Sequence, residues 1–374
     1  MTTDFEIVNG ARAASTTTTM RTPPDIDKPC SDNEWSRLIE VVVGRAGNSC
    51  FPHVPLKAIS NIVPCCYLDE FAKPGNPIPE DIVQKAEAEL DNFADVLQSY
   101  GVKVRRPEAV DWVQEGGYTG AMVRDGLMVV GNTIIEAAFS WPCRRREIEL
   151  LHGPMLDEFE KKGSYHVVRA PAPPSPDPIF DVEPGAPWAI NNSRVAFDTA
   201  DFTRIGRRIV IGELSHVTNQ KGLDWVRAHL PPGYELVVIT STGTAGMHID
   251  DTLVPLRDGT ALYYPEYVHL EELRRHPPLD TWRLLPPPKP FPMPKYPRPT
   301  CAQGRWRSTC WCWTGSGSFA TMTIPRRFAF SRGWAWSLFP SRSGMLPAWA
   351  VHFTVLPWTS TGRGSEYQVW YERF

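Results

Sequence analysis

Short apolar segments alternate with longer amphipathic ones from residue 38 onward, and this alternation constrains the fold more than any other feature of the sequence. Residues 79–101 repeat apolar side chains at helical spacing, carry acids in the first turn and end at Gly101. Residues 234–240 (YELVVIT) are mostly apolar, too short for a typical helix and bounded by Gly, Pro and Ser, which is typical of a strand. The pattern predicts an α/β fold, without the Gly-rich fingerprint of a dinucleotide-binding fold.

The expected elements follow from the same two periodicities. Residues 126–137 read as two strands or one bent strand, and the helix at 146–163 is expected to carry its charged residues on the outside. Further strands are expected within 38–47, 102–107, 166–171, 207–214, 234–240 and 252–256, and further helices within 79–101 and 219–230.

The composition changes abruptly after a Pro-rich loop at 286–299. Residues 297–374 hold eight of the fourteen tryptophans and nine arginines, but only two acids and no Lys, Asn or Asp. A folded domain of ordinary composition is about a quarter charged, with acids and Lys common. We therefore expect a disordered tail over 1–30, one folded domain over 31–290, and an aberrant Trp-, Arg- and Pro-rich region over 291–374 with no helix or strand pattern.

The bulk properties exclude several classes of protein. The net charge of -3 suggests no nucleic-acid or membrane partner. No apolar run approaches the ~20 residues that a membrane span needs. The eight cysteines include no Cys-x-x-Cys pair, so buried reduced thiols are expected and no metal. The first thirty residues lack the apolar region of a signal peptide and contain acids, which favours a cytoplasmic protein, with a mitochondrial location as the alternative.

The segment AGMHIDDT (245–252) is the clearest candidate for chemistry. It follows a Gly-containing run and precedes an apolar strand. If the segment is extended, His248 and Asp250 project to the same side, because alternate residues of a strand share a face. The pair is then either a buried structural hydrogen bond or a catalytic base beside a carboxylate that binds a cation.

Several longer motifs, in the same order and spacing, give the chain a resemblance to the amidinotransferases, which include glycine amidinotransferase and the aminocyclitol amidinotransferases. The resemblance covers roughly residues 31–290. It implies a pentein fold, in which five αβ modules form a propeller around a central site, with the last module of this chain lost or disordered. The motifs are NEWSRLIEVVVGRAGNSC (33–50), AMVRDGLMVVGNTIIEA (121–137), FDTADFTRIGRRIVI (197–211), VTNQKGLDWVRAHL (217–230) and GMHIDDT (246–252).

The resemblance also implies roles for individual residues. It makes His248 the catalytic acid and base and Asp198 its partner, while Asp125 and Asp250 hold the substrate guanidinium; it implies no cofactor. The chemistry is reasonable, since carboxylates bind the planar guanidinium through its fixed donors and a thiolate suits its weakly electrophilic carbon. Taken alone, however, Asp198 is better explained as a helix N-cap and Asp125 as an ordinary turn residue, and only the joint match of the motifs favours catalytic roles.

The nucleophile is absent from the sequence as it stands. The family has its cysteine near the C-terminus in a Gly-Gly-x-x-His-Cys setting, and Cys310 and Cys312 lack that context. Regrouping the codons one base back converts Cys310 to Thr314 into Leu-Val-Leu-Asp whatever codons are used. The same shift permits His-Cys at the codons of Phe353, Thr354 and Val355. The region after about residue 290 therefore reads as out of frame, with the cysteine expected near Thr354/Val355.

The expected function is transfer of an amidino group from arginine to an acceptor amine, with release of ornithine. The chain as it stands is expected to be inactive, because it lacks the thiol. Hydrolysis of arginine by a deiminase-like enzyme and arginine binding without catalysis are the alternatives. Residues 263–268 (YYPEYV) contain no Arg where the glycine-type enzymes have one, so the acceptor is either glycine or an amine that is not an amino acid. The partners are small molecules, and a homodimer is left open.

Overall fold

The structure is a computed structural model that describes residues 30–59, 73–242, 247–286 and 354–357. The expected tail, apart from Cys30, and the aberrant region, apart from residues 354–357, lie outside the described residues. So does most of the Pro-rich loop at 286–299. Among the described helices, none has the length and apolar character to cross a membrane.

One repeated unit builds the described part of the chain. Strands β3 (Leu127–Val130) and β4 (Thr133–Glu136) form an antiparallel hairpin, which turns at Gly131 with a φ of 55° that glycine adopts without strain. Helix α6 (Glu147–Lys162) follows, and β5 (His166–Val168) then returns parallel to β4. The segment 126–137 therefore forms two strands rather than one bent strand.

The same order of two antiparallel strands, a helix and a parallel strand recurs in three further sheets of the described residues. One sheet contains β6 (Phe202–Arg204), β7 (Ile209–Glu213) and β8 (Glu235–Ile239), with α7 (Gln220–His229) before β8. The next contains β9 (Leu253–Arg257), β10 (Thr260–Tyr263) and β11 (Arg283–Leu285), with α8 (Leu270–Arg274) before β11. The last contains β12 (Thr354–Pro357), β1 (Leu38–Val42) and β2 (Lys103–Arg105), with α3 (Glu80–Ser99) before β2.

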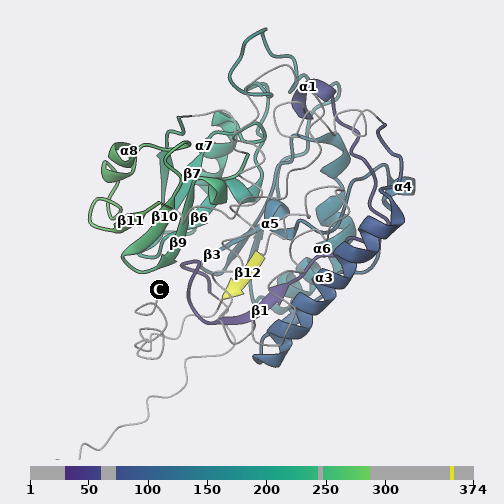
Figure 1. Cartoon of the computed structure of the whole chain (residues 1–374), viewed down its shortest axis with the longest axis horizontal. Helices are drawn as coiled ribbons and strands as arrows, with labels where there is room; N and C mark the ends of the chain where they lie inside the picture. Colours follow the sequence, from purple (N-terminus) through teal and green to yellow (C-terminus); the bar gives the residue numbers. More distant parts are fainter. Residues whose placement is uncertain (1–29, 60–72, 243–246, 287–353, 358–374) are drawn as a thin grey trace, which may run out of the picture.

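The four modules follow one another around the molecule, with α3 and α8 at opposite edges (Figure 1). The α/β fold of repeated modules predicted from the sequence is confirmed, and the long helices and most strands lie within the predicted ranges. Short helical turns were not predicted. They are α1 (Leu56–Ile59), α4 (Trp112–Glu115), α5 (Val123–Gly126) and the 3₁₀ turns η2 (Pro142–Arg144), η3 (Thr199–Asp201) and η4 (Ile249–Asp251).

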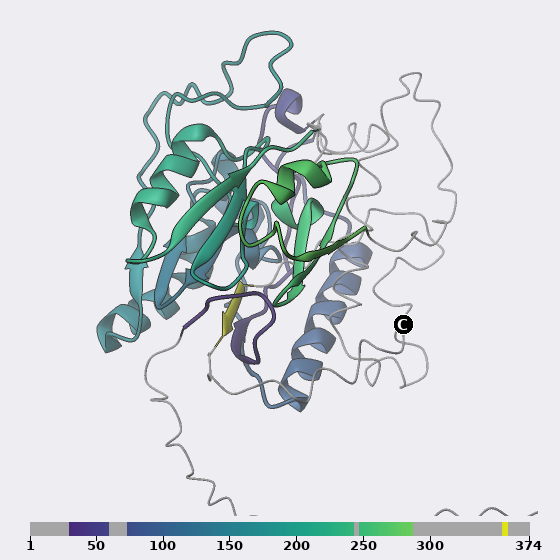
Figure 2. The same ribbon diagram turned by 90° about the vertical axis from the view of Figure 1, so that its left-hand side faces the viewer.

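Strand β12 differs from the expectation that residues 297–374 contain no regular element. It pairs antiparallel with β1, so that Val42 faces Thr354 and Val41 faces Val355. It lies beside β1 in both views and near β3 in the first (Figures 1 and 2). In the first module β12 occupies the position that β3, β6 and β9 occupy in the others. The first sheet is therefore completed by a strand from the far end of the chain.

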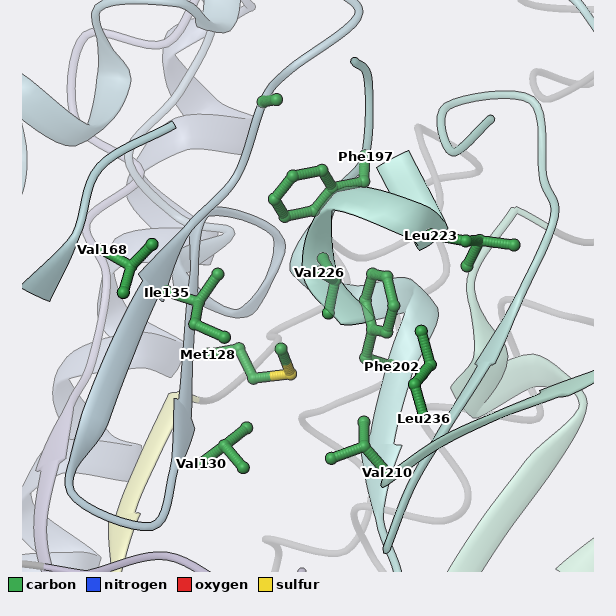
Figure 3. Packing of buried hydrophobic residues seen from close by; sticks show 11 residues of the cluster. Met128, Val130, Ile135, Val168, Phe197, Phe202, Val210, Leu223, Val226 and Leu236 are labelled. Carbon is green, nitrogen blue, oxygen red and sulfur yellow. The ribbon is translucent and has the colours of Figure 1, made fainter. Parts of the chain in front are cut away.

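Apolar side chains form the core both within single modules and between neighbouring ones. Figure 3 shows one such cluster, in which Met128, Ile135 and Val168 from the second module lie on one side and Phe202 and other residues of the third module on the other. All of these side chains are at most 9% exposed. Burial of apolar area is the main favourable term in folding, so the contacts between modules hold the site-bearing turns in place.

The segment that precedes β1 ties two modules together. Ser31 pairs with Gly131 and Asn33 pairs with Ile205 through isolated β-bridges. Arg204, at 2% exposure, binds both carboxylate oxygens of Glu34 at 2.8 and 2.7 Å and also donates to the carbonyl oxygen of Val129. Residues 31–34 therefore lie across the second and third modules, next to strands β3 and β6.

Candidate active site

Short helical turns position all four predicted site residues. Asp125 lies on α5 directly before β3, and Asp198 immediately precedes η3, which leads into β6. His248 immediately precedes η4, and Asp250 lies within that turn, before β9. The turn η3 contacts both α5 and η4. The second, third and fourth modules thus each place a site residue just before their first strand, and the contacts between these turns bring His248, Asp198 and Asp125 to one place.

The predicted extended geometry of His248 and Asp250 is wrong. His248 has extended backbone angles, with φ of -131° and ψ of 153°, but the chain then enters the 3₁₀ turn η4. Asp250 therefore does not follow the alternation of a strand. His248 is 2% exposed and Asp250 is half-buried.

The structure brings His248, Asp198 and Asp125 together. The imidazole Nε2 lies 3.4 Å from Oδ2 of Asp198, and Nδ1 lies 3.8 Å from Oδ1 of Asp125. One donor atom from each of the three lies within 4.8 Å of the others, and all three side chains are buried. Asp198 occupies the N-cap position of η3, but its side chain makes no capping hydrogen bond there. The helix-cap interpretation of this carboxylate is therefore wrong.

Two residues of the site were not predicted. Arg144, at the end of η2, places Nη1 2.7 Å from Oδ2 of Asp125 and 3.4 Å from Oδ2 of Asp198. Its Nε and Nη2 each lie 2.8 Å from an oxygen of Glu147. Glu147 is 4% exposed, so the expectation that charged residues of this helix face outward fails for it. The three-residue spacing from Arg144 to Glu147 is a weak signal that the sequence does contain.

Burial and charge act against each other on these acids. Burial raises the pKa of Asp198, and the repulsion from Asp125 raises it further, while His248 and Arg144 act to lower it. Burial likewise raises the pKa of Glu147 to about 7, although Arg144 opposes this. Buried carboxylates this close together remain ionised only if cations lie among them.

A further buried acid supports the turn that carries His248 and Asp250. Glu213, the last residue of β7, accepts hydrogen bonds from Ser241 and, at 3.1 Å, from Thr252. Burial raises its pKa to about 7, with Asp250 adding to the rise. Glu213 therefore links the end of β7 to the residues on both sides of η4.

The structure describes three cysteines. Neither of the two buried ones, Cys50 and Cys143, has the lowered pKa of a reactive thiol. Burial and the nearby Asp111 raise the pKa of Cys50, whose thiol donates to the carbonyl oxygens of Trp112 and Gly117. Burial raises the pKa of Cys143 to about 12. A thiolate is the reactive form, so both are structural thiols, as the sequence predicted. The third, Cys30, is half-buried.

Comparisons with known proteins bear on this site. No protein-family model matches the chain. The chain is 35% identical to the mitochondrial glycine amidinotransferase of Danio rerio over 284 residues, which are 70% of this chain but only 66% of that protein. It is 34% identical to the L-arginine:L-lysine amidinotransferase of Pseudomonas savastanoi pv. phaseolicola over 282 residues, covering 70% of this chain and 74% of that protein. Among solved structures, an amidinotransferase of the saxitoxin pathway of Microseira wollei superposes with a TM-score of 0.62 at 32% identity, covering 71% of this chain and 79% of that one.

Proposed function

Because this chain belongs to the amidinotransferase family, we propose that its site transfers an amidino group from arginine to an acceptor amine, through a cysteine-bound intermediate and with release of ornithine. The observation that supports this best is the buried meeting of His248 with Asp198 and Asp125, from three separate modules. Such a set combines a titratable base with two carboxylates that favour a cationic substrate.

The proposed reaction has two halves. A cysteine thiolate attacks the guanidinium carbon of arginine, and the bond from that carbon to the ε-nitrogen breaks. His248 gives this nitrogen, which becomes the δ-amine of ornithine, its proton. The acceptor amine then attacks the amidino carbon, the carbon–sulfur bond breaks, and His248 takes a proton from the incoming nitrogen. Asp198 orients the imidazole and stabilises its charged form. Asp125 and Asp250 hold the guanidinium through charge-assisted hydrogen bonds.

The repeated module supports the proposed origin of the thiol. Site residues precede the first strands β3, β6 and β9, and the first residues of these strands, Leu127, Phe202 and Leu253, each pair near the end of the second strand. Thr354 of β12 has the equivalent position, paired with Val42. The one-base shift permits His-Cys at the codons of residues 353–355. The position of β12 in its module and the one-base shift thus independently support a cysteine at the start of β12.

The acceptor is proposed to be glycine or an amine without a carboxylate. A carboxylate-bearing acceptor needs a cation to meet it, and residues 263–268 contain no Arg or Lys. Tyr267, within this stretch, is 3% exposed and packs on Tyr264 with ring centroids 5.0 Å apart. This segment favours the amine without a carboxylate over glycine.

The location is proposed to be either the cytoplasm or the mitochondrion. The zebrafish relative is named as a mitochondrial enzyme, which supports the second. Imaging of the full-length protein fused at its C-terminus to a fluorescent protein separates the two.

The transcript across the codons for residues 280–374 should be sequenced first. A one-base difference or an unspliced junction that restores His-Cys gives the full-length protein to be assayed for ornithine release from arginine, with and without an amine. The protein as its sequence stands is the control and should release none. Robust turnover by the control contradicts the proposal, and citrulline formation without an amine assigns a hydrolase instead. If the transcript confirms the present frame, calorimetry with arginine tests for binding without catalysis.

A further inference from the structure

Arg144 contacts both Asp125 and Asp198 in this site, as His248 also does. Its side chain is 4% exposed, and its guanidinium carbon lies 4.2 Å from the centroid of the Phe139 ring. The ring covers one face of the guanidinium, as in a cation–π contact. The arginine therefore cannot turn toward solvent without losing contacts on several sides.

The orientation of the guanidinium is fixed from behind. Glu147 takes Nε and Nη2 side-on, with both distances at 2.8 Å, which is the two-point geometry that arginine makes with a carboxylate. This leaves Nη1 to contact the Oδ2 atoms of Asp125 and Asp198. A lysine at this position would keep the charge but lose the two-point contact, because its ammonium is a single point of charge.

The contacts form a chain from Glu147 through Arg144 and Asp198 to His248. Without the arginine, two buried carboxylates would lie side by side with only His248 between them, and one would take up a proton. A protonated Asp198 no longer stabilises the charged imidazole. A protonated Asp125 no longer attracts a guanidinium with full charge.

We propose that Arg144, held by Glu147, is a positioning residue of the reaction: a resident guanidinium that keeps Asp125 and Asp198 ionised and oriented before the substrate guanidinium arrives. It also limits how Asp125 meets the substrate. Since Oδ2 of Asp125 lies 2.7 Å from Arg144, the substrate is left chiefly with Oδ1. The second contact to the substrate guanidinium then falls to another acid, for which Asp250 is the proposed residue.

The catalytic consequence rests on the proposed function, so the first test needs no turnover. Urea unfolding of the full-length protein is measured at pH 5.5 and pH 8 for wild type, Arg144→Gln, Glu147→Gln and the double variant Arg144→Gln/Glu147→Gln. Arg146→Gln, whose side chain is 55% exposed, is the matched control. Tyr118 and Cys143 also lie near Arg144, but burial raises the pKa of both far above this range, so they stay neutral.

Arg144→Gln should make folding more sensitive to pH. In this variant the folded state is expected to hold an extra proton on Asp125 or Asp198. Its folding equilibrium constant should then fall as the pH rises from 5.5 to 8, by up to about tenfold more per pH unit than that of wild type. Burial raises the pKa of Glu147 to about 7, so the double variant is compared with the single variant Glu147→Gln and should show the same excess over it. Arg146→Gln should follow wild type. An equal loss at both pH values indicates packing alone and overturns the inference. Disappearance of the excess in the double variant places the proton on Glu147 and overturns it too.

The second test uses protein that turns over arginine. Arg144→Gln should lower kcat by up to about 100-fold with a smaller change in KM, because the arginine acts on the orientation of the catalytic groups. Arg144→Lys should recover part of the loss. A rise in KM with kcat unchanged contradicts the positioning role. If wild type neither binds nor turns over arginine, the proposed function fails, while the unfolding comparison still decides the role of Arg144.

Discussion

The contacts of Glu34 with Arg124 and Arg204 should together contribute about 3 kcal/mol to stability at neutral pH. Glu34 accepts from Arg204 at 2.7 and 2.8 Å, lies 3.5 Å from Arg124, and is 14% exposed. These arginines outweigh burial and lower its pKa from 4.5 to about 2. At about 1.36 kcal/mol per pH unit, that fall corresponds to about 3 kcal/mol. Loss of one partner from a buried pair typically costs about 3–5 kcal/mol, which agrees.

The substitution Glu34→Gln tests this value through its pH dependence. A lowered pKa gives stability that is complete above the unfolded value of 4.5 and is lost as the pH falls toward 2. The difference in unfolding free energy between wild type and variant should therefore shrink from about 3 kcal/mol at pH 7 to about 2 kcal/mol at pH 3.5. Urea unfolding followed by tryptophan fluorescence measures it, and the exposed Glu183→Gln is the control. A difference below about 1 kcal/mol at pH 7, or one that is the same at both pH values, refutes the reasoning.

Other substitutions test the packing and the chemistry. Gly222→Ala should destabilise the protein by about 1–3 kcal/mol, because its Cβ would lie 2.2 Å from the carbonyl oxygen of Ala196; urea unfolding should show a lower midpoint. Gly153→Ala, in α6 with nothing within 4 Å of a Cβ, should instead stabilise by up to about 1 kcal/mol, and a loss there would contradict the helix-propensity argument. In the protein that turns over arginine, His248→Gln should lower kcat about 100- to 10,000-fold with an unchanged circular dichroism spectrum, and activity close to wild type would remove this histidine from the mechanism. Asp250→Asn should mainly raise KM for arginine in steady-state assays, and an unchanged KM would exclude it as a guanidinium ligand.

Periodicity located the long elements but not the turns that carry the site. Helix α3 was predictable because Ala86, Leu90 and Ala94 form a buried stripe at helical spacing. The turn η4 has three residues, which is too short for any period to register, so the segment around His248 was predicted as extended. The short strands β6, β10 and β11 also escaped prediction, although β2 and β5 are no longer than β6 and were predicted.

Burial of individual charges was also beyond the sequence. Arg144, Arg145 and Arg146 are consecutive and chemically identical, yet the first is 4% exposed and the last 55%. What separates them is contact with Asp125, which lies earlier in the same module, and with Asp198, which lies on the next module. The candidate residues Asp125, Asp198 and His248 were found together only because several motifs resembled one family in register. Each residue alone fitted an ordinary structural role.

The strand β12 has a consequence for how the protein is made. Val42 of β1 pairs with Thr354 of β12, so 312 positions of the sequence separate two neighbours in one antiparallel strand pair. At about 5–20 residues per second, β1 leaves the ribosome about 15–60 s before its neighbour is synthesised. During that interval β1 has an open edge, and such edges favour pairing with other chains. The first module to emerge is thus the last to be completed, and a change of reading frame near residue 290 would act on a sheet that was translated at the very beginning.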